Sequence, residues 1–251
     1  MPIVKFTVQL ADVTGILDLA DTITVHDPAL SYLAHRPMAS PLLAGAVVLL
    51  CARFEEFLKD VVVYALERHG YSQPPLALWD LPEDMQIHLI AESLNAAAQA
   101  TRHGTRRPAP LRISESLAAA REVVNGVISA EYAIDTGGNP GSETVKALMK
   151  IAGVTEPWKK VSDHLSASYV APTIPGVSTS TIANPANQLD ELIKLRNTVA
   201  HSGTSIPAPS SEIRFDVDFL RQLSNSIYDV LKTHVDTFCA SSGRTPAVWA
   251  R

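Results

Sequence analysis

Apolar residues recur at the spacing of an α-helix along most of the chain. From Ser40 to Gly70 they fall every three or four positions, which predicts one long helix with a continuous apolar face. The pair Ser40-Pro41 is typical of a helix start, and Gly70 is typical of a helix end. A second pattern, from about Ser211 to Cys239, predicts a long amphipathic helix near the C-terminus.

Shorter apolar patterns fill the region between these two helices. They predict further helices at residues 82–101, 114–130, 142–153 and 157–169, and one that begins near residue 185. Runs rich in proline, glycine, serine or threonine predict loops, including residues 102–110, 137–141 and 170–183. Because no long strand pattern and no internal repeat is present, the sequence predicts an all-α protein of several helices joined by loops.

The two ends of the chain carry weaker patterns. We expect residues 1–39 to be an N-terminal extension, in which the alternation of Val4, Phe6 and Val8 predicts a short strand and residues 13–20 predict a short helix. Residues 40–240 form the expected helical domain. Residues 241–251 are polar and predict a loose tail.

Composition and charge narrow the class of protein. With 46% hydrophobic and 19% charged residues, the chain is expected to be folded and soluble. Its longest apolar run, Leu42 to Leu50, is far shorter than the roughly 20 residues that a membrane span needs. No secretory signal is recognisable, and the two cysteines match neither a disulfide framework nor a metal site, so we expect a cytoplasmic protein.

The net charge of −5 argues against binding of nucleic acid through the overall charge of the protein. An RNA ligand would need a local basic patch, and the loop that contains Arg102, Arg106 and Arg107 is a candidate. This loop has no interleaved aromatic residues for base stacking, so an ordinary solvated loop is an equally good interpretation.

Arg196 stands out because it interrupts an apolar helix face. At about 100° per residue, it falls near the middle of a stripe that includes Leu189, Leu192 and Val199. A guanidinium keeps its charge in a protein, and its burial is costly unless an anion or several acceptors meet it. One explanation is a structural ion pair with Glu55 or Glu56, and the other is a binding site for an external anion.

His201 lies five positions after Arg196 and points about 140° away from it on a regular helix. Asn197 shares the side of His201, because these two residues are four positions apart. Arg196 and His201 could meet at a frayed helix end near Gly203, or between two copies of the helix related by a two-fold axis. The second arrangement predicts a homodimer.

The segment from Leu192 to Gly203 resembles the signature helix of the HEPN superfamily, in which an arginine, a polar residue that is often asparagine, and a histidine recur. Residues 52–60 are similar to the long helix of the RiboL-PSP-HEPN and MAE_28990-like group. Gly138-Asn139-Pro140, followed by apolar residues at 145, 148 and 151, is similar to its middle segment. The resemblance spans roughly residues 40–240.

This resemblance implies a helical bundle that dimerises so that two signature helices form one cleft. Many such proteins are metal-independent endoribonucleases of defence or toxin–antitoxin systems, and others have lost activity and bind ligands. Arg196, Asn197 and His201 would be the catalytic residues. Glu55 and Lys59 partly match a further motif and would support them, although Val63 stands where that motif has phenylalanine; a surface ion pair is the alternative interpretation.

These residues suffice for RNA cleavage without a metal or another cofactor, because RNA carries its own nucleophile, the 2′-hydroxyl group. His201 could move the proton, Arg196 could hold the phosphate oxygens, and Asn197 could orient His201 or the phosphate. We therefore expect RNA, a second copy and, in a toxin–antitoxin context, a neutralising protein as partners, and no membrane. A non-catalytic module that binds a nucleotide, RNA or protein, and a structural adaptor, are the alternatives.

Overall fold

The computed structural model describes residues 1–25, 36–99, 109–131, 133–138, 140–168, 184–202 and 209–249. Over these ranges it consists of eight α-helices and one 3-10 turn, and it contains no strand. The prediction of an all-α fold is therefore confirmed.

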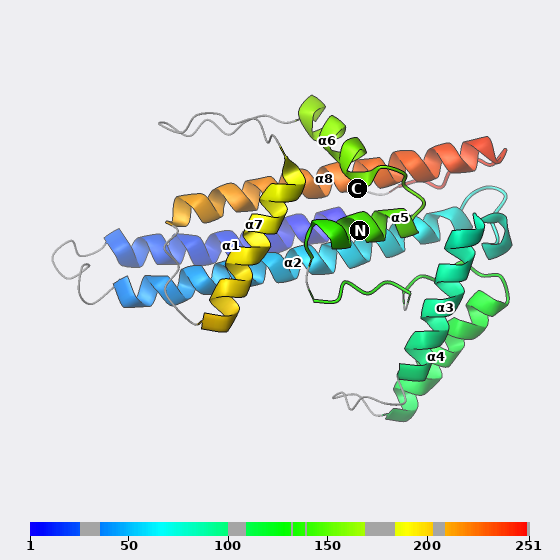
Figure 1. The fold of residues 1–251 in the computed structure, drawn as a ribbon, viewed down its shortest axis with the longest axis horizontal. Helices are drawn as coiled ribbons and strands as arrows, with labels where there is room; N and C mark the ends of the chain where they lie inside the picture. Colours follow the sequence, from blue (N-terminus) through cyan, green and yellow to red (C-terminus); the bar gives the residue numbers. More distant parts are fainter. Residues whose placement is uncertain are drawn as a thin grey trace.

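Three long helices form an elongated bundle (Figure 1). They are α1 (Pro2–Val25), α2 (Arg36–Gly70) and α8 (Ser210–Ser241). α1 runs antiparallel to α2, and α8 runs in the same direction as α2. The apolar core between them includes Leu50, Phe54 and Leu58 of α2 and Leu220 and Leu223 of α8, each at most 1% exposed.

The N-terminal segment is a helix, so the predicted short strand is wrong. Buried residues of α1 follow a strict spacing of three and four positions: Ile3, Phe6, Leu10, Val13, Leu17 and Ala20. Val4 and Val8 are 47% and 66% exposed, whereas Phe6 is 1% exposed and its ring lies 5.0 Å from that of Phe57. The alternation of three apolar residues had concealed this helical pattern, and α1 is part of the same core as α2.

The helices α3 (Glu83–Gln99) and α4 (Ala109–Val124) pack together and project from the C-terminal end of α2 (Figure 1). The short turn η2 (Leu78–Asp80) precedes α3. α4 ends at Val124 instead of the expected residue 130. The reason is Gly126, whose φ of 86° leaves the helical region and whose carbonyl accepts the Leu78 N–H at 2.7 Å.

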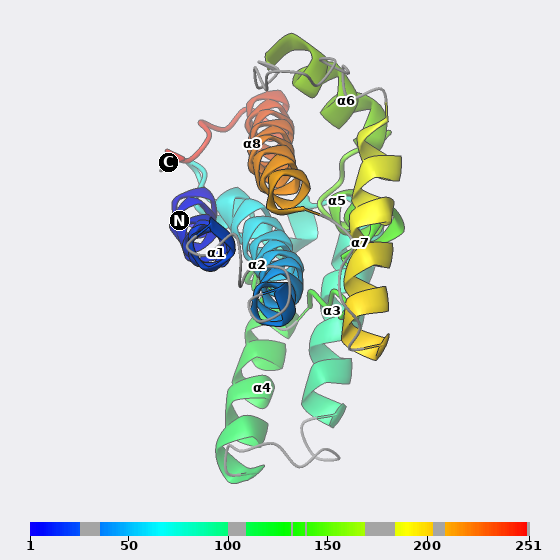
Figure 2. The ribbon, with the colours of Figure 1, turned by 90° about the vertical axis from the view of Figure 1, so that its left-hand side faces the viewer.

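The remaining helices are α5 (Ser142–Ile151), α6 (Pro157–Ser168) and α7 (Pro185–Ser202). α7 runs across the bundle, past α8 and α2 (Figures 1 and 2). Asp190 fixes its position, because its carboxylate accepts the backbone N–H of Ser142 at 2.8 Å and the hydroxyl of Ser142 at 2.7 Å. One side chain of α7 thus caps the first turn of α5.

The segment that follows α8 packs against the bundle, in contrast to the loose tail expected from its polar sequence. The backbone N–H of Gln73 donates to the carbonyl of Thr245 at 2.9 Å, and the Thr245 N–H donates back at 2.8 Å. Trp249 donates from Nε1 to Asp236 at 2.9 Å. None of the helices, as far as the chain is described, combines the length and the apolar character needed to cross a membrane.

The helical character of the N-terminal segment can be tested with Phe6→Ala and Val8→Ala. We expect Phe6→Ala to lower the free energy of unfolding by about 3–5 kcal/mol, because it leaves a cavity against α2. Val8→Ala should change it by less than about 0.5 kcal/mol, since Val8 is exposed. Urea unfolding followed by circular dichroism measures both. Equal effects of the two substitutions would contradict the helix, because residues 6 and 8 lie on the same face of a strand but not of a helix.

Candidate functional site

Arg196 lies on the side of α7 that faces α2. Its side chain is half-buried, and its positive charge acts on the buried thiol of Cys51 in α2. Burial raises the pKa of Cys51 to about 12 in spite of this charge, so Cys51 is a neutral, apolar neighbour. Arg196 therefore stands at a contact between two helices where the surroundings supply little solvation.

His201 lies on another side of the same helix and is exposed. Because α7 remains helical through Ser202, the alternative in which a frayed helix end brings Arg196 and His201 together does not apply. The two side chains instead diverge by about 140°. The structure thus places Arg196 against α2 and leaves His201 facing outward.

Asn197 binds Arg196. The guanidinium donates from Nη1 to the Asn197 side-chain oxygen at 2.9 Å. The expected role of Asn197 was to orient His201 or the phosphate, but its observed partner is the arginine. The hydrogen bond restricts the guanidinium to one orientation, so Asn197 acts on the direction in which Arg196 presents its remaining N–H groups.

The two acids proposed as structural partners of Arg196 are bound elsewhere. Glu55 accepts a hydrogen bond from the hydroxyl of Thr136 at 2.5 Å. Glu56 pairs with Lys5 at 2.8 Å and with Arg53 at 3.2 Å. Among the residues that the structure describes, Arg196 forms no ion pair with a carboxylate, and its Nε is buried without a hydrogen-bond partner. A structural ion pair with Glu55 or Glu56 is therefore not observed.

Glu55 and Lys59 differ in their relation to this region. Glu55 follows Cys51 by one helical turn, about 6 Å along α2, and so lies on nearly the same side of that helix. Lys59 is exposed, and the described residues show no ion pair between Lys59 and Glu55. Arg102, Arg106 and Arg107, the proposed RNA-binding residues, lie outside the described residues.

Asp216 of α8 is a candidate that the sequence analysis missed. Burial, together with the negative charge of Glu212, raises the pKa of Asp216 to about 7. Its charge, like that of Arg196, acts on the thiol of Cys51, which therefore lies near both α7 and α8. Asp216 belongs to no motif, but it stands three residues after Ile213 and four before Leu220, two fully buried positions, and this spacing marks it as an acid near the core.

The described residues contain no group of three or more histidine, cysteine, aspartate or glutamate side chains placed to hold a metal ion. The groups at or near α7 are a guanidinium held by Asn197, an exposed imidazole and the carboxyl group of Asp216. Such a set can bind an anion and transfer protons.

Comparison with known proteins identifies one family. The family model described as RiboL-PSP-HEPN matches residues 16–233, from the second half of α1 to the last third of α8. No curated protein and no solved structure matches the chain. The matched range is more than half of the sequence and contains Arg196, Asn197 and His201.

The buried acid gives a testable pH dependence. Because the pKa of Asp216 rises from 3.8 to about 7 on folding, the folded chain holds this proton more tightly, and Asp216 makes stability fall as the pH rises from about 4 to about 7. We expect Asp216→Asn to remove this loss. The free energy of unfolding of the variant, relative to that of the wild type, should therefore rise as the pH increases across this range. Urea unfolding at several pH values measures the difference.

Glu212→Gln is the matched control for this measurement. It removes the neighbouring charge and should shift the pH range for Asp216 downward without abolishing the effect. A constant difference between Asp216→Asn and the wild type at all pH values would contradict the raised pKa.

Proposed function

The chain belongs to the RiboL-PSP-HEPN family of the HEPN superfamily, and we propose that it is a metal-independent endoribonuclease with a composite site between two copies. In this proposal Arg196 and Asn197 of one copy and His201 of the other act on one RNA phosphate. The reaction would take place in the cytoplasm, in a defence or toxin–antitoxin system. A HEPN module that binds a nucleotide or RNA without cleaving it is the alternative.

The proposal rests on the surroundings of the Arg196 side chain. Its guanidinium is half-buried and oriented by Asn197, and no carboxylate of the described residues neutralises it. A charge in that setting favours an anion that binds from outside, and a phosphate offers two oxygens to the planar N–H groups. Arg196 is therefore suited to hold the phosphate and the additional negative charge of the transition state.

In this proposal His201 carries out the proton transfers. Its neutral imidazole takes the proton of the 2′-hydroxyl group, and the 2′-oxygen forms a bond to phosphorus while the bond from phosphorus to the 5′-oxygen breaks. The His201 imidazolium formed in this way gives the proton to the leaving 5′-oxygen. The products are a 2′,3′-cyclic phosphate end and a free 5′-hydroxyl end, and no water is consumed in this step.

The direction of the side chains supports a site shared by two copies. Arg196 and His201 diverge on one regular helix, so one copy of α7 does not bring them together. The C-terminal end of α7 extends past α2, away from α8 (Figures 1 and 2), and His201 is exposed there. A two-fold axis near this end would place each His201 opposite the Arg196 of the other copy.

Cleavage can be tested on purified full-length protein with end-labelled RNA in the presence of EDTA. We expect products with 2′,3′-cyclic phosphate ends and no cleavage of a substrate with 2′-deoxyribose. Arg196→Ala should lower the rate by about 10²–10³-fold and His201→Ala by about 10²–10⁴-fold. Lys194→Ala, which removes an exposed charge of the same helix, should change it by less than about 3-fold. Cleavage that needs added magnesium would contradict the scheme.

A mixing experiment tests whether the site is shared. An equal mixture of Arg196→Ala and His201→Ala chains contains half mixed dimers, and each has one site with an intact Arg196 and an intact His201. We expect about one quarter of the wild-type activity to return after the two variants exchange subunits. No recovery, with subunit exchange confirmed by mass spectrometry, would place the site within one copy.

A further inference from the structure

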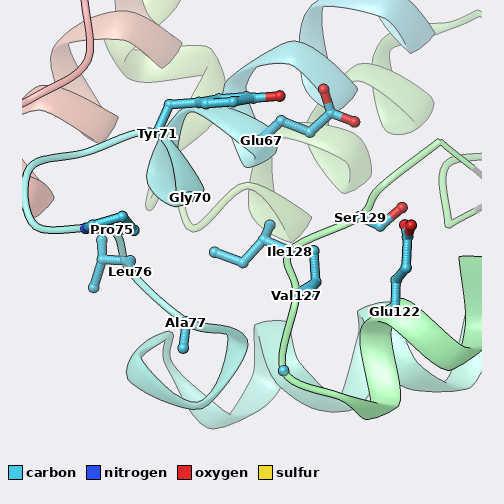
Figure 3. A pocket seen from close by; sticks show the side chains of 11 residues that line it. Glu67, Gly70, Tyr71, Pro75, Leu76, Ala77, Glu122, Val127, Ile128 and Ser129 are labelled. Carbon is cyan, nitrogen blue, oxygen red and sulfur yellow. The ribbon is translucent and has the colours of Figure 1, made fainter.

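A cavity of about 490 Å³ lies at the C-terminal ends of α2 and α4 (Figure 3). Its walls come from three segments: the end of α2 with Glu67 and Tyr71, the linker with Leu76, and residues 122–129 with Glu122 and Ile128. This volume falls within the range of about 300–1,000 Å³ typical of small-molecule sites. No residue of the Arg196 region lines it.

Two glutamates line this cavity from different elements. Figure 3 shows Glu67 on α2 and Glu122 on α4, with the hydroxyl of Ser129 beside the Glu122 carboxylate. Within the described ranges, no hydrogen bond or ion pair of either carboxylate is observed. Burial and the nearby charge of Glu131 raise the pKa of Glu67, and the opposite effect of Arg68 is smaller.

The backbone adds to this negative potential. α2 ends at Gly70 and α4 ends at Val124, so the C-termini of two helices meet at the cavity. Each C-terminus carries a partial negative charge of about half an elementary charge. This arrangement is independent of the side chains, and it also favours a cation.

The neighbouring cation is engaged elsewhere. Arg68 places its guanidinium 4.2 Å from the ring centre of Tyr64 and 4.9 Å from that of Tyr71. It also donates to the carbonyl of Val248 at 3.3 Å. Its charge lowers the pKa of Glu67 less than burial and Glu131 raise it, so Arg68 does not neutralise the cavity.

Part of the cavity wall is apolar. Leu76 and Ile128 are buried in this wall, and Tyr71, which is 60% exposed, lies at the edge. A ligand that matches these walls has a methylene chain for the apolar part and a positive charge at each carboxylate. We propose that the cavity binds a linear aliphatic polyamine, with one ammonium group at Glu67 and another at Glu122.

This site is separate from the proposed ribonuclease site. Glu67 follows Cys51, the neighbour of Arg196, by 16 positions on α2, which corresponds to about 24 Å. Polyamine binding can therefore be measured without RNA, and its failure would leave the proposed cleavage untouched.

The proposal can be tested by isothermal titration calorimetry of the full chain with spermidine and with putrescine at 150 mM salt. We expect saturable binding of one molecule per chain. Glu67→Gln and Glu122→Gln should each weaken it by at least about 10-fold, because each removes one charge-assisted contact. Asp163→Asn on α6, which removes one exposed charge far from the cavity, is the matched control and should have little effect.

A second arm uses N-acetylputrescine, which keeps the methylene chain and one ammonium group. We expect it to bind at least about 10-fold more weakly than putrescine, since only one carboxylate finds a partner. Equal binding of the two compounds would overturn the two-point site. Weak binding that does not saturate would also overturn the proposal. So would an equal loss of affinity in the Asp163→Asn control and in the Glu67 and Glu122 variants, because either result would indicate attraction by the overall charge of the protein.

Discussion

The burial of α2 on three sides is the constraint on which the structure depends. α1 packs on one side, α8 on another, and α7 crosses a third (Figure 2). A helix in this position must be apolar around most of its circumference, as α2 is from Ala46 to Leu66. A charged side chain next to α2, such as Arg196 near Cys51, therefore lies in a poorly solvated environment. Electrostatic interactions are stronger there than in water, so they depend strongly on the orientation of the charged group.

This environment explains why the same few residues are candidates for chemistry. A guanidinium held by Asn197 cannot reorient freely and keeps its charge, while the carboxyl of Asp216, near the same thiol, has a pKa near neutrality. A charged group and a group that titrates near pH 7 are the components from which proton-transfer sites are built. His201 adds a third group, an imidazole that is exposed to solvent.

Sequence patterns predicted those parts of the molecule that depend on local spacing. The long apolar periods identified α2 and α8, and the signature around Arg196 lies in α7, as expected. The strand predicted from Val4, Phe6 and Val8 is wrong, because three alternating apolar residues are compatible with a strand and also with part of a helical repeat. Asp216 and the bond between Thr136 and Glu55 could not be predicted, since each depends on which distant segments meet in the fold. The partner of Asn197 depends on a rotamer, which spacing does not determine.

The clamp between Asp190 and Ser142 has a mechanical consequence. It fixes α7 to α5 at one point, while His201 lies 11 residues further on, about 16 Å away along the same rigid helix. A rotation of about 4° at the clamp therefore moves His201 by about 1 Å. The first turn of α5, which touches neither Arg196 nor His201 in the described contacts, thus sets the position of the C-terminal end of α7 and of the imidazole that it carries.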